Sequence, residues 1–243
     1  MKAIKSEDSG EINKIEAARY TFLTLQAAFD RLIRLPLRDF AANPLTEAEA
    51  IEVLHDAWSI VDYGNRFCQV SESIRGLKRK DPRREAMMAA ARSLNPIRNY
   101  IQHLKAETST KLDEIAPILG ALSWCSADGK QSFTLTLGTL PTGAALNSLG
   151  ADATTNRYAD QFLLDVGPEN VDLKQVYFAL ADMFQYIEEH LQQAGMLWPE
   201  DLIPVLLTTG ELRGPRASGH FRVRIVITEE NKRHHVSLLR DDV

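Results

Sequence analysis

Apolar residues recur every three or four positions over residues 11–35, which predicts a long helix with one buried face. Pro36 lacks a backbone N–H and is expected to end that helix. A second helix is predicted to begin at Thr46, because Thr46 and Glu49 form a capping box in which each side chain binds the other residue's backbone N–H. Its apolar stripe continues to Phe67.

Two shorter helices are predicted next. Asp81 is expected to cap the first, over residues 82–92. A separate helix is predicted to begin at Asn95, with Pro96 at the first helical position, where its missing N–H costs nothing. The apolar positions that follow have helical spacing and extend that helix to about Glu107.

The pattern of apolar and polar residues changes after Glu107. Shorter alternating or continuous apolar runs, separated by Gly, Asp and Pro, predict strands, and one longer periodic stretch predicts a helix. The expected strands are residues 118–125, 132–138, 161–166, 221–228 and 236–239, and the expected helix is 171–193. The sequence therefore predicts an α+β protein, with an N-terminal antiparallel helical domain over 1–115 and a smaller domain of antiparallel sheet plus helix over 116–243.

Composition and net charge argue against some functional classes. The chain has 243 residues, of which 44% are apolar and 25% charged, as in ordinary globular proteins. Its net charge of −5 argues against a protein that coats nucleic acid in bulk, so any RNA contact must be local. The polar N-terminus and the lack of a long apolar run predict neither a secretory signal nor a membrane span. Cys68 and Cys125 are far apart without metal-ligand spacing, which favours a reduced, cytoplasmic setting.

The main candidates for site residues are Arg98 and His103, which are predicted to project from one short helix. Arg98 carries a permanent charge, whereas histidine titrates near neutral pH. Five residues of helix place the two side chains roughly 140° apart, too wide for direct contact. Asn99 and His103 do share a face. A site that uses both Arg98 and His103 therefore needs a groove, or a second copy of the helix supplied by a twofold homodimer.

The sequence Arg98-Asn99-Tyr-Ile-Gln-His103, at the start of a late helix in an all-helical segment, resembles the motif of HEPN ribonucleases. The stretch over residues 56–67 is similar to a helix of uncharacterised bacterial HEPN-like proteins, and the resemblance covers about residues 11–107. It implies an antiparallel helical bundle and a metal-independent endoribonuclease that uses no cofactor, with Arg98, Asn99 and His103 as catalytic residues.

The residue types suit that chemistry. His103 can move the proton of the 2′-hydroxyl and that of the leaving 5′-oxygen, and Arg98 can grip two phosphate oxygens. Asn99 would orient the phosphate or the imidazole. A helix that begins at Asn95 would add backbone donors and a favourable dipole for the phosphate.

Two further groups are candidates in supporting roles. Asp62 would orient His103 if its carboxylate faced the imidazole; the alternative is an exposed ion pair between Asp62 and Arg66, four residues apart. The segment from Arg75 to Arg84 is the most basic, with six Lys or Arg among ten residues, and it could hold RNA phosphates beside Arg98 and His103 or be a solvated connector. Its cations are Arg75, Lys78, Arg79, Lys80, Arg83 and Arg84.

A non-catalytic alternative stays open. In that interpretation the helical half dimerises, Arg98 and His103 are residues of a helix–helix seam, and the chain binds a nucleotide, an RNA or a protein partner. The sequence identifies neither an RNA target nor a partner such as an antitoxin or a nucleotidyltransferase, and it assigns no function to the α+β half.

Overall fold

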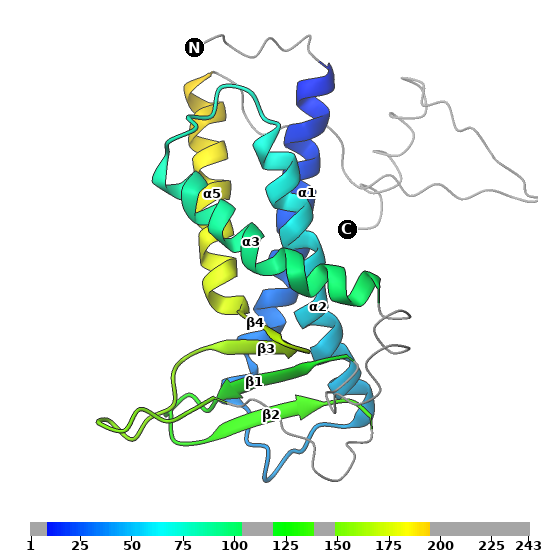
Figure 1. Cartoon of the computed structure of the whole chain (residues 1–243), viewed down its shortest axis with the longest axis vertical. Helices are drawn as coiled ribbons and strands as arrows, with labels where there is room; N and C mark the ends of the chain where they lie inside the picture. The colour runs from blue at the N-terminus through cyan, green and yellow to red at the C-terminus, as the bar shows by residue number, and fades with distance from the viewer. Residues whose placement is uncertain (1–8, 104–118, 139–148, 195–243) are drawn as a thin grey trace, which may run out of the picture. The chain divides into compact units, whose positions relative to one another are not determined.

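The computed structural model describes residues 9–103, 119–138 and 149–194 and combines helices with one antiparallel sheet, which confirms the α+β class (Figure 1). The strands predicted at 221–228 and 236–239 lie outside the described residues. In chain order the described elements are α1 (Ser9–Leu32), the 3-10 helix η1 (Leu35–Leu37), α2 (Glu47–Glu72), α3 (Pro82–Gln102), β1 (Ala121–Cys125), β2 (Ser132–Thr136), β3 (Phe162–Val166), β4 (Glu169–Asp172) and α5 (Leu173–Gln193).

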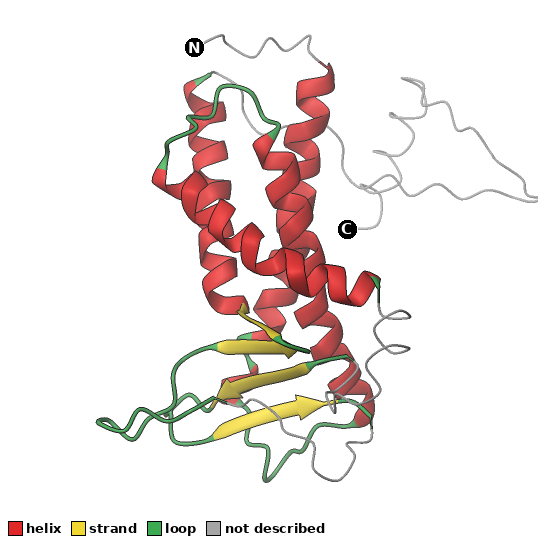
Figure 2. Ribbon diagram, in the orientation of Figure 1, coloured by secondary structure: helices red, strands yellow, loops and turns green. Residues whose placement is uncertain are grey.

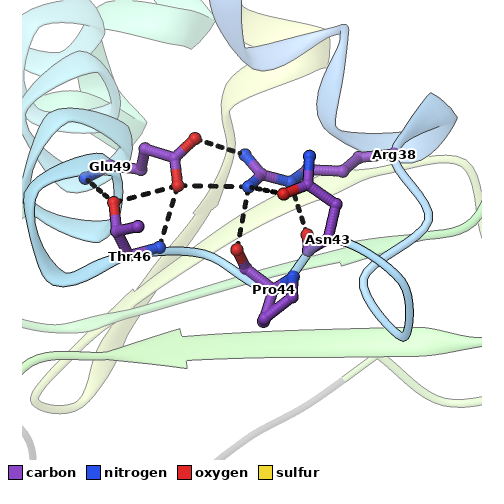
Figure 3. A network of polar contacts seen from close by, with 5 residues as sticks. All are labelled: Arg38, Asn43, Pro44, Thr46 and Glu49. Atoms are coloured by element: carbon purple, nitrogen blue, oxygen red, sulfur yellow. Dashed lines mark hydrogen bonds and ion pairs between the residues drawn. The ribbon is translucent and has the colours of Figure 1, made fainter.

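The predicted capping box forms at the start of α2. Thr46 Oγ1 accepts a hydrogen bond from the backbone N–H of Glu49, and Glu49 Oε2 accepts one from the backbone N–H of Thr46 at 2.8 Å. Arg38 adds contacts that were not predicted from the sequence. Its guanidinium donates hydrogen bonds to both carboxylate oxygens of Glu49 and to the backbone carbonyls of Asn43 and Pro44 (Figure 3). The network fixes the turn that leads from η1 into α2.

Stacked aromatic rings join three of the helices. Phe22 of α1 stacks on Phe184 of α5 at 4.3 Å between centroids and lies 5.5 Å from Phe67 of α2. Further along α1, Phe29 stacks on Tyr177 of α5 at 3.9 Å. Such pairs add to the burial of apolar area that drives folding.

The sheet has the strand order β2-β1-β3-β4, and every neighbouring pair is antiparallel. The strand β1 is buried along its whole length. The sequence missed β4, which pairs with β3 through a two-residue turn at Gly167 and Pro168. Gly167 has a φ of 58°, which a two-residue hairpin turn requires and which glycine adopts without strain.

Most of the helical part lies beyond the β4 edge of the sheet, on the side away from β2 (Figure 2). Phe29 of α1 contacts Phe162 of β3 edge-on, and the indole N–H of Trp58 on α2 donates to the carbonyl of Leu119, just before β1. The described parts of both predicted domains therefore share one core, and all of them fall within a single compact unit, Met1–Met196. The predicted boundary near residue 115 does not separate two cores among these residues.

Candidate functional site

The helix that carries Arg98 and His103 does not begin at Asn95, as the sequence suggested. It is the end of α3, which runs unbroken from Pro82 to Gln102 with Pro96 inside it. Asp81 caps this longer helix through the backbone N–H of Arg83, as predicted. Its buried residues keep helical spacing across residues 90–97, so apolar burial outweighs the backbone bond lost at Pro96.

Asn95 has another role. Its side-chain oxygen accepts a hydrogen bond from the amide of Asn65, a residue of α2 that is only 1% exposed. The oxygen of Asn65 in turn accepts a hydrogen bond from Gln69 at 2.9 Å. Buried amides require partners, and Asn95 supplies one across the contact of α2 with α3 instead of capping its own helix.

The candidate site therefore lies at the C-terminal end of a helix, whereas the sequence predicted the N-terminal end. Arg98 lies in the last turns of α3, and His103 is its C-cap residue, with its backbone N–H donating to the carbonyl of Asn99 at 3.0 Å. The C-terminus of a helix presents carbonyl oxygens and partial negative charge. The predicted contribution of a helix N-terminus to phosphate binding is thus wrong for these residues.

Arg98 is held by a carboxylate. Its Nε lies 3.4 Å from Oδ1 of Asp62 on α2, and its side chain is 24% exposed. Within the described residues the two terminal nitrogens of this guanidinium have no hydrogen-bond partner. The planar group is therefore oriented by one edge, while its terminal donors remain available to an anion.

Asp62 binds arginines and forms no ion pair with His103. Besides Arg98, it pairs with Arg66 one turn further along α2, with 2.8 Å between Arg66 Nη2 and Asp62 Oδ2. The alternative pair Asp62–Arg66 is thus present, and the expected orientation of His103 by Asp62 is not. The carboxylate joins a cation of α2 to one of α3.

His103 and Asn99 are both exposed at the end of α3. Because α3 is continuous as far as Gln102, the angle of about 140° between Arg98 and His103 persists in one chain. Tyr100, between them, packs against the turn of β3 and β4: a Cβ added at Gly167 would lie 3.2 Å from its ring. The sheet thereby anchors the helix end that presents the three motif residues.

The basic segment lies at the other end of α3. Fifteen residues of helix place Arg83 about 22 Å from Arg98 along the axis, so these cations do not adjoin the site within one chain. Arg83 pairs with Glu189 at 2.8 Å, which raises the pKa of its guanidinium, and it covers the ring of Tyr186. Arg75 pairs with Glu11. The side chains of Lys78, Arg79 and Lys80 are exposed, and that of Arg84 is half-buried.

Sequence reasoning missed two residues at this site. Arg66 was considered only as a partner that would neutralise Asp62, and Tyr63 was not considered. In the structure Arg66 also lies over the ring of Tyr63, 5.4 Å from its centroid. The spacing Asp62-Tyr63-x-x-Arg66 puts these groups on adjoining positions of a helix and was the signal available for finding them.

Across residues 9–103, 119–138 and 149–194, no three His, Cys, Asp or Glu side chains gather closely enough to hold a metal ion. None of the helices in those ranges is both long and apolar enough to cross a bilayer.

The chain was also compared with known proteins. No protein-family model matches it, and no curated protein or solved structure is significantly similar to it.

Proposed function

We propose that the C-terminal end of α3 is a metal-independent, RNA-cleaving site of the HEPN type. The observation that carries the proposal is the state of Arg98, whose guanidinium is oriented by Asp62 while its terminal donors are unpaired among the described residues. Asn99 and His103 are exposed at the same helix end. We also propose that the helical part of the chain has a HEPN-like fold.

The chemistry needs three steps from these residues. His103 accepts the proton of a ribose 2′-hydroxyl, whose oxygen attacks the adjacent phosphorus. Arg98 binds two non-bridging oxygens and stabilises the charge of the phosphorane. The bond to the 5′-oxygen then breaks, and the imidazolium returns the proton to that oxygen. The products are a 2′,3′-cyclic phosphate end and a 5′-hydroxyl end, and Asn99 orients the phosphate.

The site requires two copies of the chain. Arg98 and His103 diverge by about 140° on a single helix. We place Arg98 of one copy opposite His103 of the second, as a twofold axis near the end of α3 would allow. A homodimer in solution is therefore part of the proposal.

The test is cleavage of RNA by the full chain in EDTA. The wild-type protein is expected to cleave and to leave 2′,3′-cyclic phosphate ends, and His103→Ala is expected to lose activity without a change in melting temperature. His55→Ala is a matched control, because His55 is also an exposed histidine, with 77% of its side chain accessible on α2. Equal cleavage by wild type and His103→Ala would overturn the assignment.

One observation favours a second function, recognition of a phosphate without cleavage. The site lies at a helix C-terminus, whose dipole opposes negative charge and therefore disfavours the more highly charged phosphorane more strongly than a bound phosphodiester. Tight binding of a mononucleotide that depends on Arg98, with no RNA cleavage by the wild type, would establish this function in place of the first.

A further inference from the structure

We propose that Tyr63, Arg66 and Arg98 form a subsite for one nucleotide of single-stranded RNA, with the base stacked on Tyr63 and its phosphate held by the two guanidinium groups. This inference rests on the proposed function, because it assigns the substrate contacts that flank the cleaved bond. It adds two residues of α2 to a site whose proposed RNA-contacting residues so far all lie on α3.

The first argument is charge. Asp62 holds Arg66 at 2.8 Å and Arg98 at 3.4 Å, so two cations from different helices are gathered around one anion. The cluster keeps a net charge of +1 in a chain whose net charge is −5. A phosphodiester carries one negative charge and would neutralise it. Local positive charge of this kind is what an acidic protein needs in order to bind RNA.

The second argument is geometry. Asp62 occupies only the Nε edge of Arg98 and one terminal nitrogen of Arg66. The proposal places one anion between the remaining donors of both groups. Arginine binds phosphate in this way because its planar fork matches two oxygens at once.

The third argument is the aromatic ring. Tyr63 is half-buried, and Arg66, three residues later, lies over its ring with 5.4 Å between Cζ and the centroid. The proposal places the base against the part of the ring that Arg66 leaves uncovered, next to the cations that hold its phosphate. This combination of ring and cation is typical of proteins that bind single strands without sequence preference.

Binding can be measured apart from cleavage. The full chain carrying His103→Ala is titrated into a labelled single-stranded RNA of mixed sequence, and fluorescence anisotropy gives the affinity. Adding Tyr63→Leu is expected to weaken binding by about tenfold or more, whereas Tyr63→Phe keeps the ring and the affinity. Adding Arg66→Gln is expected to reduce the slope of log K against log salt by about 0.7, the value for one phosphate contact on a single strand.

Two controls match these changes. Tyr20→Leu removes another tyrosine, 52% exposed on α1, and Arg34→Gln removes another exposed arginine. Neither is expected to change affinity or salt slope. Melting curves of every variant identify losses that come from unfolding, and a photoreactive uridine placed in the RNA should crosslink to Tyr63 in the protein with Tyr63 and Arg66 intact.

The outcomes separate the two proposals. If Tyr63→Leu and Arg66→Gln bind as tightly as their parent, the subsite is wrong, even if the wild type cleaves RNA. If those variants lose affinity but the wild type does not cleave, the subsite holds and the nuclease is wrong. Failure of the parent chain to bind RNA would overturn both.

Discussion

Arg98 is oriented by its neighbours before any ligand binds. Its contact with Asp62 restricts a long side chain, and an anion that binds it need not order it again. Arg98 and His103 could be singled out from the sequence because the motif that they resemble is short and local. It did not show that Asp62 serves Arg98 instead of His103, because that depends on how α2 crosses α3.

The first prediction concerns Asp62. Replacing Asp62 with Asn leaves Arg98 without its carboxylate, so the cleavage rate should fall by about tenfold or more, because a misplaced guanidinium stabilises the phosphorane less well. The free energy of unfolding should change by less than about 1 kcal/mol, since exposed ion pairs contribute little to stability. Steady-state kinetics and urea unfolding of the same sample check both. An unchanged cleavage rate would show that Asp62 has no part in positioning Arg98.

A second residue-scale prediction concerns Cys68. Burial raises the pKa of its thiol to about 12, because the thiolate would lose its hydration. Native Cys68 should therefore resist alkylation at pH 8, and it should react fully once the chain is unfolded. Peptide mapping after labelling measures this residue separately from Cys125. Rapid labelling of native Cys68 would contradict the burial described here.

At the scale of elements, local signals predicted most of the structure. The capping box of Thr46 and Glu49, the cap at Asp81 and the presence of the first two strands were all predicted correctly. Two predictions from the sequence failed, each for a physical reason. The start of a helix at Asn95 was wrong because contacts with α2 override the local preference of Pro96. The strand β4 was missed because it has four residues and only one of them is buried.

The unbroken α3 leads to a prediction for Pro96→Ala. Proline inside a helix removes one backbone hydrogen bond and crowds the preceding turn, at a cost of about 3 kcal/mol. Alanine should therefore raise the free energy of unfolding by about 1 kcal/mol or more, after allowance for the stiffer unfolded chain that proline provides. Chemical denaturation measures the difference. No gain in stability is the result expected of proline at the first position of a separate helix.

The turn before α2 predicts a dependence on pH. The guanidinium of Arg38 and the donors of Thr46 lower the pKa of Glu49 from 4.5 to about 2. Because the pKa is lower in the folded state, Glu49 stabilises the fold fully above about pH 4.5, and this contribution disappears as the pH falls through about 2.

The comparison of wild type with Glu49→Gln tests this dependence. The wild type should be the more stable of the two near neutral pH, and the difference should shrink steadily below pH 4.5, as thermal unfolding at a series of pH values would show. A difference that stays constant between pH 6 and the acid limit would contradict the role of the ionised carboxylate.

At the scale of the whole molecule, the helices and the sheet of the described residues form one core. Stacked rings of α1 and α5 and the contact of Tyr100 with the turn at Gly167 connect the two predicted halves. The sequence predicted helices and strands on both sides of residue 115 but not the core that they share, because contacts between distant segments leave no local pattern. The site on α3 therefore depends on the sheet behind it as well as on the helices.

The central claim is that two copies of this helix end form one RNA-cleaving site. The most direct test mixes full chains carrying Arg98→Ala with full chains carrying His103→Ala, after mild unfolding and refolding to exchange subunits. A mixed dimer has one intact pair, Arg98 of one copy beside His103 of the other. The account predicts that the mixture recovers RNA cleavage in EDTA that neither variant has alone. A mixture as inactive as its components, beside an active wild type treated in the same way, would contradict it.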